Sequence, residues 1–309
     1  ARGFPYPIGR PDVEPDSRFY RWIYSTPMMD EYLPELAVAM IDGEQLGADG
    51  SIDFLGLSFS ATDAIGHDFG PNSPEILDTI LRLDGYLGKL FDHLDAVVGM
   101  EHVIVALSAD HGVATLPEYL EMADDRYGEE GKRLDAEDVR CVQNAGLRFR
   151  EQFGDADWFL DGFHLDPATV ESQGTTVAEV EGALAALLEE CPAIDKVWTS
   201  TGLAEVEIGD TTDRMAELHR NNQAPGRSPN LRPQLVSGDL YYPGQGTSHG
   251  SPHVYDTHVP LILAGPGIAA RTIEQRVHTV DLAPTLAALI DLTPLEELDG
   301  VDRSPLIRD

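Results

Sequence analysis

The sequence predicts an α/β fold in which a mostly parallel sheet is sandwiched by helices and carries an inserted α+β subdomain. The runs IDFLGLSFS (52–60) and HVIVALSAD (102–110) are short and apolar, as buried parallel strands are. A long helical pattern separates them. Strand, helix and strand in this order predict a βαβ unit with a right-handed crossover.

The helix between the two runs has a clear beginning and one apolar face. Ser73 predicts the N-cap, Pro74 suits the first helical position, and Glu75 adds an acid to the first turn. Apolar residues then recur every three or four positions, which predicts a single buried face. They are Ile76, Ile80, Leu83, Leu87, Leu90, Leu94 and Val97.

Residues 118–228 predict the inserted subdomain, and residues 1–117 with 229–309 predict the core. The insert is expected to hold a helix near 134–153, a strand around 158–165, a helix at 176–190, a strand at 196–200 and a helix at 213–222. The core is expected to be completed by strands at 233–243 and 259–267 and by a capped helix at 279–290.

Composition narrows the possible partners. The 309 residues carry a formal charge of −33, from 54 acidic and 21 basic side chains. Such a surface repels nucleic acid and anionic membranes, so neither is expected as a partner. No apolar run approaches the ~18 residues of a membrane span. Cys141 and Cys191 could form one disulfide or remain two buried thiols, and the sequence leaves both open.

Two pairs of acid and histidine follow the predicted strands. Asp63 and His67 come after the first strand, and Asp110 and His111 come directly after the second. In open α/β sheets ligands bind outside the carboxyl ends of the strands. Carboxylate oxygen and imidazole nitrogen are ligands that suit zinc. Residues 244–260 add three more histidines before another apolar run. Bound metal ions would also supply the positive charge that an anionic substrate needs in so acidic a chain.

The motifs SATDAIGHDFGPNSPEILDTILRLD, LSADHG, GTSHGSPHVYDTHVP and VDLAPTLAALI resemble the alkaline phosphatase superfamily. The resemblance is strongest to its monomeric bacterial branch with a threonine nucleophile, which is related to type I phosphodiesterases and nucleotide pyrophosphatases. It covers the C-terminal portion of such an enzyme and implies an alkaline phosphatase-like fold.

The resemblance implies zinc-dependent hydrolysis of phosphate esters through a phospho-enzyme. One zinc ion would bind Asp63, His67 and His249. A second would bind Asp110 and His111, together with an aspartate and the nucleophilic threonine. We expect these last two upstream of residue 1, so no catalytic nucleophile is expected in this chain. The missing N-terminal segment could then act as a second chain.

The alternatives are a phosphodiesterase or nucleotide pyrophosphatase, or an inactive fragment that holds one zinc ion. His253 and Asp256 could support the ligands without touching the metal. Thr26, which precedes Pro27, predicts a helix N-cap rather than a displaced nucleophile. The expected substrate is a small phosphate ester, and the resemblance implies a periplasmic or extracellular location.

Overall fold

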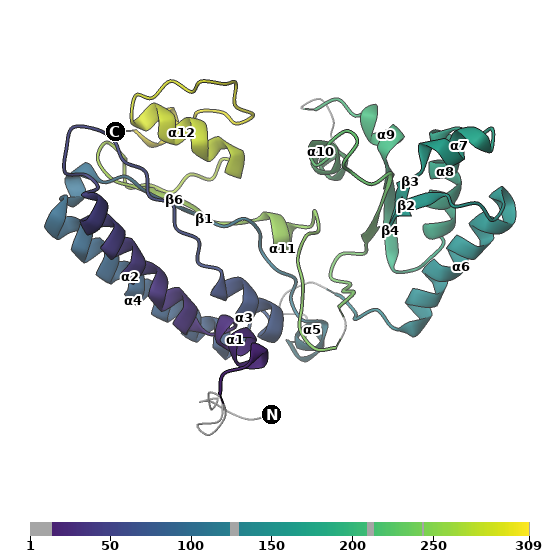
Figure 1. Ribbon diagram of the computed structural model, residues 1–309, viewed down its shortest axis with the longest axis horizontal. Helices are drawn as coiled ribbons and strands as arrows, with labels where there is room; N and C mark the ends of the chain where they lie inside the picture. The colour runs from purple at the N-terminus through teal and green to yellow at the C-terminus, as the bar shows by residue number, and fades with distance from the viewer. Residues whose placement is uncertain (1–13, 124–129, 209–212, 243, 309) are drawn as a thin grey trace. The chain divides into compact units, whose positions relative to one another are not determined.

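A computed structural model divides the chain into two compact units, which are described one at a time (Figure 1). The first unit comprises residues 1–112 and 258–309, and the second comprises residues 113–257. The structure describes residues 14–123, 130–208, 213–242 and 244–308. Helices and paired strands occur in both units, which confirms the α/β class.

Two long helices, α2 and α4, lie side by side and run in the same direction in the N-terminal part of the first unit (Figure 1). Ala37, Ile41 and Leu90 are buried where they meet, because each helix places an apolar stripe toward the other. Ser73 caps α4 as predicted: its hydroxyl accepts the N–H of Ile76 at 3.2 Å. The helices before the first strand are α1 (Ser17–Tyr24), α2 (Pro27–Glu44), α3 (Ala61–Phe69), α4 (Pro74–Val97) and the 3₁₀ turn η1 (Met100–His102).

The predicted apolar face of α4 is only partly buried. Leu90 is 4 % exposed, whereas the side chains of Ile80 and Val97 are about half exposed. Thr79 and Tyr86 take their place on the buried side. Helical spacing therefore located the helix correctly, but its packing partners decided which side chains are covered.

The predicted strand at 52–60 is wrong for the described structure, which assigns no strand there. Leu55 and Leu57 pack against the apolar cluster between α2 and α4. Ile52 and Phe54 are exposed to solvent, Phe54 over 86 % of its surface. A strand needs a neighbour to satisfy its backbone N–H and C=O groups. No described strand pairs with this segment, so the βαβ unit does not form.

The second predicted strand of the core is present but pairs differently. Strand β1 (Val105–Ser108) lies antiparallel to β6 (Leu261–Ala264), with Val105 opposite Ala264. The described two-stranded sheets are all antiparallel, so the parallel order is not found among them. Gly265, directly after β6, has φ +138°, and a Cβ at this position would lie 2.5 Å from the Val103 carbonyl oxygen. Only glycine therefore fits this close approach of the two backbone segments.

The C-terminal helix of the first unit is held by a buried acid. The turn η2 (Thr279–Asp281) leads into α12 (Leu282–Leu289), and a short helix α13 (Ser304–Ile307) follows. Asp281, 2 % exposed, accepts the N–H of Val301 at 2.8 Å and the guanidinium of Arg303 at 2.8 Å. Burial acts to raise the pKa of Asp281, but these donors outweigh it and hold the pKa below its usual range.

The second unit packs helices against two small antiparallel sheets. Its core gathers around Phe149, Trp158, Val180 and Leu188, which are all almost fully buried. The helices are α5 (Pro117–Ala123), α6 (Ala136–Phe153), α7 (Pro167–Ser172), α8 (Val177–Leu188), α9 (Ser200–Ala204), α10 (Arg214–Asn221) and α11 (Val254–Thr257). The strands are β2 (Phe159–Asp161), β3 (His164–Leu165), β4 (Ile194–Thr199) and β5 (Leu231–Leu235).

Two strand predictions need correction here. The single strand expected around 158–165 is the hairpin β2–β3, because Gly162, with φ +49°, lets the chain turn back. The run at 233–243 was expected to complete the core. Its ordered part, β5, instead pairs with β4 inside the second unit, with Ile194 opposite Leu235. Both strands pack against α8, which a local sequence pattern does not reveal.

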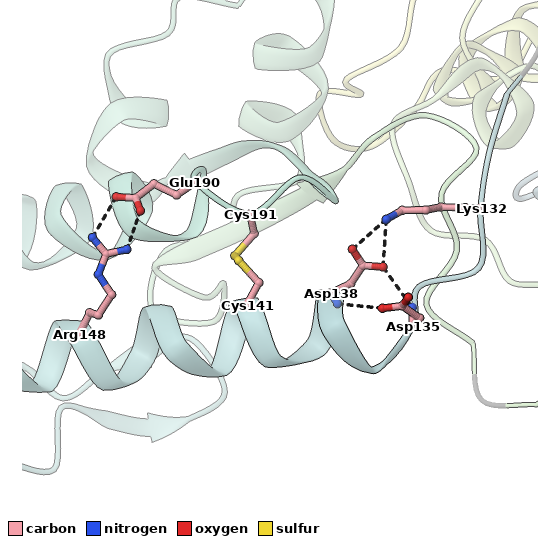
Figure 2. Close-up of a disulfide and its surroundings, with 7 residues drawn as sticks. All are labelled: Lys132, Asp135, Asp138, Cys141, Arg148, Glu190 and Cys191. Carbon is pink, nitrogen blue, oxygen red and sulfur yellow. Dashed lines mark hydrogen bonds and ion pairs between the residues drawn. A yellow bond between two sulfur atoms is a disulfide. The ribbon is translucent and has the colours of Figure 1, made fainter.

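A disulfide joins Cys141 on α6 to Cys191, 50 residues later (Figure 2). This decides the alternative that the sequence left open. Figure 2 also shows two ion pairs along α6: Arg148 binds Glu190 at 2.5 and 3.1 Å, and Lys132 binds Asp138 at 2.8 Å. Surface ion pairs contribute about 0–1 kcal/mol each to stability. The disulfide is therefore expected to contribute more to the stability of the second unit than either ion pair.

Among the described helices, none combines the length and apolar character that crossing a membrane requires.

Candidate functional site

Helix α3 presents Asp63 and His67 on one face. The two residues are four positions apart, which brings side chains together on a helix. Asp63 Oδ1 lies 3.4 Å from His67 Nε2, and the side chains are 41 % and 24 % exposed. A carboxylate oxygen and an imidazole nitrogen this close, and open to solvent, suit two ligands of one zinc ion.

The start of α3 is fixed by a residue that the sequence analysis missed. Asp30, on α2 and 3 % exposed, accepts the N–H of Ala61 at 3.2 Å. Negative charge is favourable at a helix N-terminus, where N–H groups lack partners. Burial raises the pKa of Asp30, and the Ala61 and Thr62 donors partly offset that effect. No local signal marked Asp30 in the sequence, because Glu31 follows it directly and further acids occur along the same helix.

The end of β1 leads directly to Asp110 and His111. His111 Nδ1 lies 2.8 Å from the carbonyl oxygen of Gly112. A carbonyl only accepts hydrogen bonds, so Nδ1 carries the proton and a neutral imidazole keeps its lone pair on Nε2. That is the tautomer a metal ligand needs. The Asp110 side chain is 89 % exposed, with Oδ2 at 3.6 Å from His111 Nε2.

His249 belongs to the second unit, on a loop that the fold anchors. Thr247, two residues earlier, is fully buried and donates its hydroxyl to the Ala114 carbonyl at 2.7 Å. The Ala114 N–H in turn donates to the Ser248 carbonyl at 3.1 Å. Arg133 adds a bond to the Gly246 carbonyl at 3.0 Å.

Arg133 is itself held by Glu118, which binds its guanidinium through both carboxylate oxygens at 2.8 and 2.9 Å. The paired charges keep the pKa of Glu118 below and that of Arg133 above their ordinary values. The segment that leads to His249 is therefore fixed by backbone, hydroxyl and guanidinium donors.

His253 and Asp256, predicted to support the ligands, are both buried in the second unit. His253 Nε2 lies 3.1 Å from the Leu235 carbonyl, so it donates there and ties the loop to β5. Asp256 accepts both the N–H and the hydroxyl of Ser251. Both side chains make hydrogen bonds within the second unit, and their predicted support of the metal ligands stays a prediction.

The donor set fits zinc. The first unit offers two pairs, Asp63 with His67 and Asp110 with His111, and each pair is formed by local structure. The second unit offers His249 on its anchored loop.

Thr26 lies at the N-cap position of α2 as predicted. Its hydroxyl, however, donates to the Ile23 carbonyl at 2.6 Å and makes no cap bond.

Residues 10–193 match the family model described as type I phosphodiesterase / nucleotide pyrophosphatase. The chain is 31 % identical over 297 residues to alkaline phosphatase PafA of Elizabethkingia meningoseptica, which covers 94 % of this chain and 52 % of that protein. It is 30 % identical over 300 residues to alkaline phosphatase PhoK of a Sphingomonas species, covering 92 % and 52 %.

A crystal structure of a PafA variant superposes with a TM-score of 0.80 at 27 % identity. That match covers 93 % of this chain and 53 % of the other. The chain thus spans about half the length of the curated relatives it matches, and it shares their fold.

Proposed function

The chain belongs to the type I phosphodiesterase / nucleotide pyrophosphatase family, and on that premise we propose that it is the metal-binding portion of a zinc-dependent phosphate-ester hydrolase. The observation that carries the proposal is the pair on α3, where Asp63 Oδ1 and His67 Nε2 lie 3.4 Å apart and face solvent. Similarity to alkaline phosphatases along the chain supports the same reading.

In this proposal Asp63, His67 and His249 bind one zinc ion. Asp110 and His111 bind a second, with an aspartate and a nucleophilic threonine from a segment outside residues 1–309. Bound zinc ions would stabilise the attacking and leaving oxygens of an in-line phosphoryl transfer. The chain's own residues orient the site: Gly112 keeps the His111 proton on Nδ1, and Asp30 holds the helix that carries Asp63.

Charge favours this arrangement. A chain with a formal charge of −33 repels an anionic ester everywhere except where dications are bound. The substrate in this proposal is therefore a small phosphate ester that reaches the metal ions, and nucleic acid is not a partner. The threonine oxygen would displace the ester's alcohol from phosphorus, and water would then release inorganic phosphate and restore the threonine hydroxyl.

A phosphodiesterase or nucleotide pyrophosphatase is the second candidate, favoured by the description of the matching family model. Two relatives are named alkaline phosphatases, and these names support the first candidate, a phosphomonoesterase. We also propose a periplasmic or extracellular location, because disulfides such as Cys141–Cys191 persist in oxidising compartments.

The test combines zinc content with turnover. Residues 1–309 are purified alone and together with the segment that carries the threonine, and zinc per chain is measured by atomic emission. Hydrolysis of 4-nitrophenyl phosphate and bis(4-nitrophenyl) phosphate is then compared. Two zinc ions and faster monoester hydrolysis in the combined protein support the proposal. Faster diester hydrolysis favours the second candidate. One zinc ion and no turnover in the combined protein would contradict both and leave an inactive metal-binding fragment.

A further inference from the structure

We propose that Asp256 is a positioning residue for His249: it locks the loop that follows His249 so that the imidazole is held ready for zinc. The inference rests on the proposed function, because it assumes that His249 is a ligand. It concerns only the second unit, where His249, Ser251 and Asp256 all lie.

Asp256 closes the loop onto itself. One of its oxygens, Oδ2, accepts the N–H of Ser251 at 2.7 Å and the Ser251 hydroxyl at 2.6 Å. The same hydroxyl oxygen accepts the N–H of His253 at 3.3 Å, and the His253 carbonyl accepts the N–H of Asp256 at 3.1 Å. Two short hydrogen bonds therefore converge on one carboxyl oxygen. Ser251 is therefore fixed, two residues after His249.

The residue between His249 and Ser251 makes this lock necessary. Gly250 has φ +100°, a conformation that other residues rarely adopt, and no atom lies within 4 Å of the position a Cβ would take. Glycine allows the backbone wide freedom at this point. Thr247 and Ser248 hold the chain before His249 through Ala114. The Ser251–Asp256 bonds hold it immediately afterwards.

The far side of the loop is also fixed. Thr257 donates its hydroxyl to the His253 carbonyl at 3.0 Å, and Arg214 donates to the Thr257 hydroxyl at 2.9 Å. The loop thus resists a shift at both ends, and the Asp256 carboxylate acts from a rigid base. Asp256 can orient His249 through Ser251 only if the Asp256 carboxylate is itself held in place.

The other oxygen of Asp256 indicates more than a packing role. Oδ1 is shielded from solvent and has no hydrogen-bond partner in the described structure, although Asp256 is only 3 % exposed. A buried carboxylate with one oxygen unsatisfied is costly, and an apolar side chain would fill the space without that cost. An acid is therefore present here although its burial is costly, which supports a role for Asp256 beyond packing.

The experiment is a zinc titration of residues 1–309 against a chelator of known affinity, with thermal unfolding of the zinc-free protein measured alongside. Asp256→Ala and Ser251→Ala should each weaken zinc binding about 10- to 100-fold, the effect usual for groups that orient metal ligands. Ser251→Thr keeps the hydroxyl and should restore the wild-type affinity. Ser251→Ala keeps the backbone bond to Asp256, so it gives a readout even if Asp256→Ala fails to fold.

Asp281→Ala is the matched control. Asp281 is equally buried but belongs to the first unit, where it binds Val301 and Arg303. Its loss should lower the unfolding temperature and leave the zinc affinity unchanged. Wild-type zinc affinity in folded Ser251→Ala and Asp256→Ala, with binding lost in His249→Ala, would overturn this inference alone. Absence of zinc binding by the wild-type chain would overturn the proposed function and this inference with it.

Discussion

The hydroxyl of Thr247 donates a hydrogen bond of 2.7 Å to the carbonyl of Ala114, and both residues are buried. Thr247 lies two residues before His249, and Ala114 lies three residues after His111. One hydrogen bond therefore ties the stretch that follows the Asp110–His111 pair to the loop that carries His249. The Ala114 N–H and the Ser248 carbonyl add a second bond beside it.

Replacing Thr247 with valine tests this tie. Thr247→Val keeps the shape but leaves the buried Ala114 carbonyl without its donor. We expect a loss of about 1–3 kcal/mol in the free energy of unfolding, which is the cost of an unsatisfied buried polar group. Urea unfolding followed by circular dichroism measures it. Thr247→Ser retains the hydroxyl and should stay close to wild type; equal stability of the valine and serine variants would contradict the prediction.

Removal of a proposed ligand should empty one zinc site. Asp63→Ala and His249→Ala should each lose a zinc ion and lower phosphate-ester hydrolysis by more than about 100-fold in the protein that includes the threonine, since even groups that only orient ligands cost 10- to 100-fold. Zinc content and initial rates are the measurements. His278→Ala, in the turn before α12, serves as the control and should change neither. Wild-type turnover in the His249→Ala protein would contradict the assignment of His249 as a zinc ligand.

Asp281 should make the first unit sensitive to acid. Its pKa is lowered in the folded state, so the unfolded chain takes up a proton at a higher pH than the folded chain does. The stability that it contributes is therefore present above the unfolded pKa of about 4 and is lost as the pH falls through the folded value. Urea unfolding at pH 6, 5, 4 and 3 should show the gap between wild type and Asp281→Asn narrowing. A gap that stays constant from pH 6 to pH 3 would contradict this role of Asp281.

His219 should make the stability of the second unit depend on pH in a higher range than Asp281 does for the first unit. It stacks on Trp198 with ring centres 4.9 Å apart and lies 3.2 Å from Gln234 Oε1. Burial lowers its pKa; the Gln234 bond and Asp213 oppose this, while Arg232 and Lys196 add to it. The folded state thus favours the neutral ring.

Stability should therefore fall as the pH drops below the unfolded value of about 6.5, and the loss should level off below the folded pKa. His219→Phe keeps a stacking ring but cannot titrate, so its stability should vary less between pH 7 and 5 in zinc-free buffer. Parallel slopes for wild type and His219→Phe would count against this role.

The disulfide should carry much of the stability of the second unit. Cys141 and Cys191 close a loop across 50 residues, for which the loss of chain entropy in the unfolded state corresponds to about 4 kcal/mol. Cys141→Ala combined with Cys191→Ala should lower the unfolding free energy by roughly that amount. Dithiothreitol should destabilise the wild type and leave the double variant unchanged. If the reductant shifts both proteins equally, the effect does not come from this bond.

Local sequence determined the helices and both acid–histidine pairs. The N-cap at Ser73 and the three- and four-residue spacing specify α4, because helical contacts join near neighbours in the chain. The same spacing brings Asp63 and His67 together on α3. Asp110 and His111 were found because they follow a short apolar strand.

Tertiary structure alone decided the strand partners and the groups that hold the site. The run at 52–60 is apolar yet unpaired, and β5 joins β4, because pairing depends on residues far away in the chain. The disulfide and the hydrogen bond from the Ala61 N–H to Asp30 depend likewise on distances that no spacing encodes. A buried acid looks like any other acid in a chain with 54 of them, until the fold shows which N–H groups it meets.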